Sequence, residues 1–383
     1  MMSHFFIPNH VFTGEDALQQ ALPYMKQLGE KALIVTGPHV GKSPMVEKLR
    51  EGLEEINIAY KQFDEISTEP DDTMIQKGVA IYQKEKAQFV IGIGGGSPLD
   101  AAKAIAAMSV LGGEIADYMG KEIEGEIPGI VAIPTTAGTG SEATRFTVIT
   151  DSKKDVKMLL KGDKLIPDIA VLCGENTHDM SRKVTAMTGM DALTHAVEAY
   201  TSRCASPLTD VYAKSAVKRI MKYLPIAYQN GYNAKAREQM TLAAYEAGVC
   251  INNSSVTLVH GMSRPIGALF HVPHGMSNAM LLDACLNWAM DGATMRFARL
   301  GEEIGLKEES DEKLAQAFLA QIKELVLLLQ IPTPKEYGIK QEDWEAVIDK
   351  MATDAIASGS PANTRKEITK EDCIKIYQSL YDL

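Results

Sequence analysis

The pattern of hydrophobic residues changes near residue 180, and this change limits the folds open to the chain. Before it, short apolar runs at 32–36, 89–93 and 130–133 alternate with amphipathic segments such as 45–56 and 101–108. Strands that alternate with helices are typical of βαβ units. Residues 1–180 are therefore predicted to form an α/β domain with a parallel sheet.

The second half of the chain has helical spacing almost throughout. The predicted helices cover 186–200, 209–224, 234–252, 277–290 and 314–329. Residues 181–383 are therefore expected to form an all-α helical domain. No low-complexity linker separates the halves, so the two domains are expected to pack closely around a cleft.

Charge and cysteine content restrict the partners and the compartment. The formal net charge is −11, which disfavours a nucleic-acid partner. The five cysteines are widely spaced and form no C-x-x-C motif, which suits a reducing compartment. The sequence has no signal-peptide pattern and no apolar run long enough for a membrane span. We expect a cytoplasmic protein with neither a nucleic-acid nor a membrane partner.

A glycine-rich turn joins a predicted strand to a predicted helix. It reads Gly-Ile-Gly-Gly-Gly-Ser-Pro-Leu-Asp over residues 92–100. Ser97 is predicted to cap the helix, with Pro98 at its first position and Asp100 as the acid of a capping box. The free N–H groups of such a helix start suit a pyrophosphate. The spacing is not G-x-G-x-x-G, so an ordinary Rossmann assignment fails, and a turn without a ligand is the alternative.

A second polar loop follows the next predicted strand. Residues 134–142 read Pro-Thr-Thr-Ala-Gly-Thr-Gly-Ser-Glu, which supplies many small hydrogen-bond donors. Loops at the carboxyl ends of parallel strands meet at one crevice. The two loops together predict a cofactor site, with a flexible loop as the alternative.

A set of histidines and one carboxylate suggests a metal site. Asp191 and His195 are four residues apart on a predicted helix, so they share a face. Together with His260 and His274 they form a ligand set that suits Fe²⁺ or Zn²⁺. The alternative is that each histidine is a core or capping residue. His271 competes with His274 for the fourth position.

These motifs together resemble the iron-containing, group III alcohol dehydrogenases over essentially the whole chain. The resemblance rests on residues 94–97, 134–142, 189–198 and 260–278. It implies a nucleotide-binding α/β domain, a helical domain, and a homodimer or larger homo-oligomer. It implies that Asp191, His195, His260 and His274 hold the metal, and that Phe146 and Ile251 line the substrate pocket. It places the NAD or NADP site at Gly95, Gly96, Ser97, Thr135, Thr136, Thr139 and Lys157, with Asp100 in the same turn and Gly37 at the position that often selects the cofactor.

The chain departs from the family pattern at three positions. Arg264 stands where members usually carry a histidine that helps to relay the proton. A guanidinium remains charged, so we expect water, ribose hydroxyls and His271 to move the proton, and Arg264 to bind an anionic part of the substrate or cofactor. Gly37 replaces an aspartate that is common in NAD-using members, which predicts that NADP is accepted with help from His39 and Lys42. Thr364 replaces a common proline, and we attach no function to this change.

The sequence thus predicts a metal-dependent oxidoreductase that interconverts small primary alcohols or diols and aldehydes with NAD(P). Fe²⁺ is the expected ion, with Zn²⁺ or another divalent ion as the alternative. A glycerol dehydrogenase-like or dehydroquinate synthase-like enzyme is the rival on a similar scaffold. A non-enzymatic regulator that binds metal and nucleotide is the alternative from another class.

Overall fold

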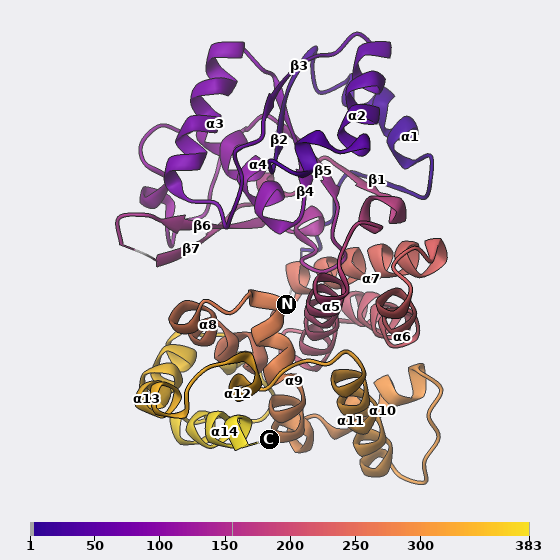
Figure 1. Ribbon diagram of the computed structural model, residues 1–383, viewed down its shortest axis with the longest axis vertical. Coiled ribbons are helices and arrows are strands. Elements are labelled where there is room, and N and C mark those ends of the chain that lie inside the picture. Colours follow the sequence, from indigo (N-terminus) through magenta and orange to yellow (C-terminus); the bar gives the residue numbers. More distant parts are fainter. Residues whose placement is uncertain (1–3, 155, 383) are drawn as a thin grey trace. The chain divides into compact units, whose positions relative to one another are not determined.

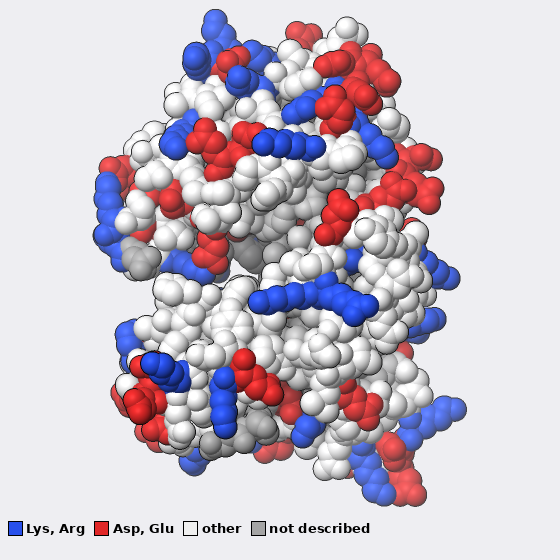
Figure 2. All heavy atoms as spheres, in the orientation of Figure 1, with Lys and Arg blue, Asp and Glu red and all other residues white. Residues whose placement is uncertain are grey.

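The computed structural model describes residues 4–154 and 156–382. The chain separates into two compact units, with the division between Asp179 and Met180 (Figure 1). None of the helices in the described part combines the length and apolar content that a membrane span requires. On the face shown in Figure 2, acidic and basic side chains are interspersed over both units.

The N-terminal unit is built on a six-stranded parallel sheet with the order β1-β8-β5-β4-β2-β3. Gly92 at the centre of the sheet pairs with Val35 on one side and Ala132 on the other. The central strands are buried on both faces, which explains their continuous apolar runs. The strands are β1 (His10–Thr13), β2 (Lys31–Thr36), β3 (Ala59–Phe63), β4 (Phe89–Gly94), β5 (Gly129–Pro134) and β8 (Ile169–Leu172).

Helices cover both faces of this sheet (Figure 1). Successive residues of β2 point to opposite faces, so Ile34 joins the core beneath α1 and α2, whereas Leu33 joins the core beneath α3 and α4. The helices are α1 (Ala17–Met25), α2 (Pro44–Glu55), α3 (Asp72–Glu85) and α4 (Gly96–Met108). An antiparallel pair, β6 (Phe146–Asp151) and β7 (Val156–Lys161), packs Ile149 and Met158 into the second core.

The start of α4 differs from the sequence-based expectation. The helix begins at Gly96 with Gly95 as its N-cap, so the prediction that Ser97 caps it was wrong. Gly94 has a φ of +153°, and a Cβ there would lie 2.6 Å from Pro98 Cγ. Gly94 therefore ends the strand with a positive φ that favours glycine. The helix then begins at Gly96, before the predicted cap at Ser97. The capping box predicted for Asp100 is also wrong, because its carboxylate accepts hydrogen bonds from Ser141 and Val148 instead.

The C-terminal unit is helical, and no strand occurs in its described residues. Each predicted helix is confirmed with somewhat different bounds. The helices are α5 (Arg182–Thr201), α6 (Pro207–Gln229), α7 (Ala234–Asn253), α8 (Leu258–Phe270), α9 (His274–Ala289), α10 (Thr294–Glu303), α11 (Asp311–Leu328), α12 (Pro334–Tyr337), α13 (Gln341–Ala357) and α14 (Lys370–Asp382).

Helix α5 lies at the centre of this unit. It packs against α6, α7 and α9 and is buried continuously from Thr188 to Thr201. Gly275, the second residue of α9, allows a close approach, since a Cβ there would lie 2.5 Å from the Met187 carbonyl oxygen. This contact brings the start of α9 against the first half of α5.

Candidate functional site

Three helices bring one carboxylate and three imidazoles together. Asp191 and His195 come from α5, His260 from α8 and His274 from the first position of α9. One possible ligand atom from each lies within 4.8 Å of all the others. Asp191 Oδ1 is 3.8 Å from Nε2 of His195, 3.9 Å from that of His260 and 3.8 Å from that of His274.

The spacing and chemistry of these atoms fit a divalent metal ion. Four donors placed tetrahedrally about 2.1 Å from an ion are separated by about 3.4 Å, so a small contraction completes the shell. One carboxylate oxygen with three imidazole nitrogens suits Fe²⁺ or Zn²⁺. The structure brings His274, rather than His271, to this cluster.

Electrostatics favours the protonation states that metal ligands need. Burial lowers the pKa of His260 well below its usual value, and the neighbouring His195 and His274 lower it further, which favours the neutral ring. Burial opposes ionisation of Asp191, but His195, His274 and the hydrogen bond from Asn278 outweigh it and hold the pKa of Asp191 below its usual value. A neutral imidazole and an ionised carboxylate can both donate an electron pair.

Glu198 orients the ring of His260 through the ring nitrogen that faces away from the cluster. It is fully buried, and its Oε1 accepts hydrogen bonds from Thr257 Oγ1 at 2.8 Å and from the Val259 amide at 2.6 Å. Its Oε2 lies 2.5 Å from His260 Nδ1, which must be the donor because a carboxylate only accepts. This bond leaves the Nε2 lone pair of His260 facing the cluster.

Asn278 contacts the cluster from α9, one turn after His274. Its Nδ2 donates to Asp191 Oδ1 at 2.7 Å and lies 3.1 Å from His260 Nε2 and 3.2 Å from His274 Nε2. Asp191 Oδ1 and the Nε2 atoms of His260 and His274 therefore converge on one amide nitrogen. Sequence reasoning missed both Glu198 and Asn278, although each is at helical spacing from a predicted ligand.

The two predicted cofactor loops lie side by side at the carboxyl ends of β4 and β5. Gly94 pairs with Pro134, and the Thr135 amide donates to the Gly94 carbonyl at 2.8 Å. A Cβ at Gly96 would lie 2.9 Å from Thr139 Cγ2, and one at Gly95 would lie 3.4 Å from Thr136 Cγ2. The structure thus brings together Gly95, Gly96, Ser97, Thr135, Thr136 and Thr139, beside the start of α4.

Both halves of the chain match models of one family. Residues 8–173 match "Iron-containing alcohol dehydrogenase", and residues 185–381 match "Fe-containing alcohol dehydrogenase family, C-terminal". The chain belongs to the iron-containing alcohol dehydrogenase family. It is accordingly an enzyme, a metal- and nucleotide-dependent oxidoreductase that acts on small alcohols or aldehydes.

Relatives match this iron-containing alcohol dehydrogenase over almost its full length. The NAD-dependent methanol dehydrogenase of Bacillus methanolicus is 35% identical, covering 94% of this chain and 96% of that protein. The NADPH-dependent butanol dehydrogenase of Clostridium saccharobutylicum is 33% identical, covering 99% and 98%. The structure of a 1,3-propanediol oxidoreductase superposes with a TM-score of 0.95 at 32% identity, covering 99% of this chain and all of that one. Both the predicted family and the predicted fold are confirmed.

In this alcohol dehydrogenase, Asp100 connects α4 to the threonine loop. Its carboxylate accepts from Ser141 Oγ at 2.6 Å and from the Val148 amide at 2.9 Å. One turn later, Lys103 Nζ donates to Thr144 O, Thr144 Oγ1 and Phe146 O at 2.8, 2.9 and 3.0 Å. These contacts hold residues 141–148 against the helix that carries the glycine turn.

Lys103 and Glu142 are buried charges that sequence reasoning missed. Burial lowers the pKa of Lys103 to about 8, although Asp100 and Glu142 oppose the shift. Burial raises the pKa of Glu142 to about 7. Lys103 lies three residues after Asp100, which was a predicted site residue. The helical spacing of the two residues could therefore have pointed to Lys103.

The remaining predicted site residues lie on several elements. Phe146 begins β6, and Lys157 on β7 forms an ion pair with Glu69 at 2.7 Å. Ile251 is buried in α7. His271 follows α8 in a left-handed conformation with a φ of +53°.

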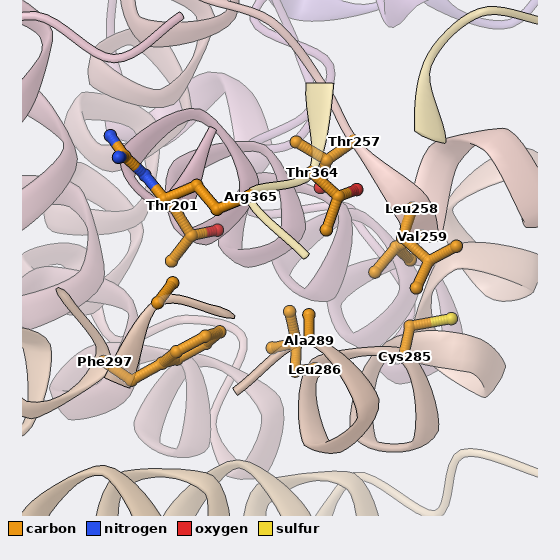
Figure 3. Close-up of a pocket in the computed structure, with 11 residues that line it drawn as sticks. Thr201, Thr257, Leu258, Val259, Cys285, Leu286, Ala289, Phe297, Thr364 and Arg365 are labelled. Atoms are coloured by element: carbon orange, nitrogen blue, oxygen red, sulfur yellow. The ribbon is translucent and has the colours of Figure 1, made fainter. Parts of the chain in front are cut away.

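None of the four cluster residues lines a small cavity in the helical unit (Figure 3). Its volume of about 10 Å³ is enough for roughly one water molecule, so neither a nucleotide nor an alcohol substrate fits. Thr364, the residue at the third departure from the family pattern, lines it, and the Thr364 hydroxyl is buried without a hydrogen-bond partner in the described residues. The other lining residues are Thr201, Thr257, Leu258, Val259, Cys285, Leu286, Ala289, Ala293, Phe297 and Arg365.

Proposed function

We propose that this enzyme interconverts small primary alcohols or diols and their aldehydes, using NAD or NADP. The observation that carries the proposal is the convergence of four ligand atoms within 4.8 Å from three helices. We assign nucleotide binding to residues 1–180 and metal binding to residues 181–383. Relatives named for methanol, butanol and 1,3-propanediol support substrates of this size.

The proposed metal ligands are Asp191, His195, His260 and His274, with Fe²⁺ as the preferred ion and Zn²⁺ as the alternative. A divalent ion bound there would supply Lewis-acid polarisation of the substrate oxygen. Glu198 fixes the tautomer of His260, and Asn278 contacts Asp191. The protein's own contribution is therefore a ligand set whose orientation is fixed by buried hydrogen bonds.

The proposed nucleotide site is the carboxyl edge of the sheet. Backbone amides at Gly95, Gly96 and Ser97, at the N-terminus of α4, suit a pyrophosphate. Thr135, Thr136, Thr139 and Lys157 supply further donors. When bound, the nicotinamide provides the redox chemistry. We also propose Gly37 and Asp100 as part of the nucleotide site. Asp100 would act indirectly, because its carboxylate holds the loop at Ser141 and Val148 in place.

We propose His271, water and ribose hydroxyls for the proton transfer. Arg264 is unsuited to it because a guanidinium stays protonated at working pH. His271 is exposed and follows the helix that carries His260, which supports a role at the edge of the site. Phe146 and Ile251 are proposed to line the pocket for the alkyl chain of the substrate.

Compartment and assembly are also proposed. All five cysteines are free in the structure, which supports a reducing cytoplasm. We propose a homodimer or a larger homo-oligomer. Light scattering on the purified enzyme would measure its mass.

Matched histidine variants test the metal assignment. His274→Ala removes one of four ligands, so metal affinity should fall by more than the roughly 10- to 100-fold expected when only a hydrogen-bond partner of a ligand is lost, and metal content and turnover should fall with it. His271→Ala should retain the metal. If His271→Ala loses metal and His274→Ala keeps it, the fourth ligand is wrongly assigned. An unchanged pH–rate profile in His271→Ala would remove that residue from the proton path.

A further inference from the structure

Arg264 is a cation located one helical turn from a proposed metal ligand. It follows His260 by four residues on α8, so the two side chains leave the same face of the helix. His260 is buried, whereas Arg264 is exposed. Burial and the neighbouring imidazoles lower the pKa of His260, and the charge of Arg264 acts in the same direction. The guanidinium is therefore within electrostatic reach of the cluster.

The guanidinium has more donors than the protein uses. Nη1 donates to the buried Ser360 Oγ at 3.1 Å. Within residues 4–154 and 156–382, no acidic side chain forms an ion pair with Arg264 and no second hydrogen bond engages it. A guanidinium offers five N–H groups in a planar fork that matches an oxyanion. Ser360 thus orients the guanidinium of Arg264 and leaves most of its N–H groups available to bind an anion.

Neither nearby carboxylate bonds to Arg264, although Glu198 acts on its charge electrostatically. Asp191 accepts from Asn278, and Glu198 accepts from Thr257 and Val259 and contacts His260. A divalent ion beside the carboxylates of Asp191 and Glu198 is close to neutral overall, so Arg264 supplies the net positive charge at this edge of the cluster. The His274 side chain is 41% exposed, while the other three cluster side chains are 7% exposed or less, so solvent reaches the cluster beside His274.

We propose that Arg264 binds the anionic end of the substrate, and that the enzyme prefers alcohols and aldehydes that carry an oxyanion a few carbons from the reacting carbon. Carboxylate, sulfonate and phosphate share the required chemistry. The proposal rests on the proposed function, because it places the reacting carbon beside the proposed metal ligands. It assigns Arg264 to substrate binding in place of the proton transfer that the family's usual histidine serves.

The test compares two aldehydes of equal chain length, butanal and 4-oxobutanoate. The wild type should show a higher kcat/KM for 4-oxobutanoate, and the preference should weaken as salt is added. Arg264→Met removes the charge at similar length, so the preference should fall by roughly 10- to 100-fold, as expected for a lost hydrogen bond to a charged group. The lower kcat/KM of Arg264→Met for 4-oxobutanoate should come mainly from a higher KM. Sulfonate and phosphate analogues of the same length then rank the oxyanions.

Two further variants separate a binding role from a structural one. Arg264→Lys keeps the charge and should retain part of the preference, and Ser360→Ala should cause a smaller loss because it only releases the fork. Equal kcat/KM of the wild type for both aldehydes, or equal losses for both in Arg264→Met, would overturn the proposal. A change in NADPH against NADH preference without a change between the aldehydes would overturn it too, because the charge would then face the cofactor.

Calorimetry gives a readout that does not need turnover. 4-Hydroxybutanoate should bind the metal-loaded wild type more tightly than Arg264→Met, and butanol should bind both equally. If no aldehyde is turned over but 4-hydroxybutanoate still binds through Arg264, the proposed function fails and the anion site stands. If aldehydes are turned over and 4-hydroxybutanoate binds both proteins equally, the anion site fails and the proposed function stands.

Discussion

At the scale of single residues, Glu198 is not one of the four proposed metal ligands, yet it determines which ring nitrogen of His260 can bind the metal. The carboxylate can only accept, so it keeps the proton on Nδ1 and the lone pair on Nε2. A glutamine at this position could still accept from Thr257 and Val259 through its oxygen. Its amide nitrogen would then face Nδ1 and favour the tautomer that cannot bind metal.

Glu198→Gln should therefore weaken metal affinity by roughly 10- to 100-fold, the range usual for partners of ligating histidines. Competition with a chelator of known affinity measures this change. Glu246→Gln is the matched control, since Glu246 is a half-buried glutamate on α7 that accepts from Ser215 and pairs with Arg219, and within the described part of the chain it forms no hydrogen bond with the cluster residues. Equal affinities for wild type and Glu198→Gln would show that the ring needs no such partner.

The sequence predicted the residues of the cluster but not the contacts that orient them. Asp191, His195 and Glu198 share one face of α5, and Asn278 follows His274 by one turn, so spacing alone could have added both partners. Thr257 and Val259 could not be anticipated. Their bonds to Glu198 depend on how the start of α8 packs against α5, which no local pattern encodes.

At the scale of elements, the end of β2 changes how cofactor preference has to be tested. A Cβ at Gly37 would lie 2.9 Å from the backbone carbonyl oxygen of Ile66. Gly37→Asp would therefore shift the backbone as well as add a charge, and its effects could not be assigned to charge alone. The exposed side chains of His39 and Lys42 offer a better test, because they change charge without crowding the turn.

We expect the wild type to use NADP at least comparably to NAD, and Lys42→Gln to lower kcat/KM for NADP by about tenfold while sparing NAD, as expected for one hydrogen bond to a phosphate. Steady-state kinetics with both cofactors measures the ratio. Lys48→Gln is the control, since Lys48 lies on the neighbouring helix and pairs with Glu175. Rejection of NADP by the wild type would mean that shape, or another acid, excludes the 2′-phosphate.

The strands that sequence patterns predicted are all buried on both faces of the sheet. β2, β4 and β5 lie inside the sheet and give continuous apolar runs. β1 and β3 are its edges, and the exposed, polar positions of β3 break its pattern. β8 is only four residues long, too short for periodicity to distinguish it from a helical segment.

At the scale of the whole molecule, the proposed metal and nucleotide sites fall in different compact units. All four cluster residues follow Met180, and the glycine and threonine loops precede Asp179. Ligands that bind one unit should stabilise that unit first, because only a native state that holds the ligand gains its binding free energy.

Removal of the metal by a chelator should lower the unfolding temperature of the helical unit by about 5–10 °C, taking about 2.7 kcal/mol for an ion at 100 times its Kd. Differential scanning calorimetry measures it, and restoring Fe²⁺ or Zn²⁺ should reverse the change. NADPH should instead raise the transition of the α/β unit. A single transition that responds equally to both ligands would show that the units unfold together.

The order of the ligands along the chain also governs when the metal centre can be made during synthesis. The glycine and threonine loops are complete before Asp191 emerges from the ribosome, and α9 with His274 emerges later still. Since domains fold as units, N-terminal first, the nascent α/β unit can fold while the metal site does not yet exist. If the proposed sites are correct, loading of the ion is a late event, and a chain stalled between α7 and α9 is expected to bind nucleotide but no metal.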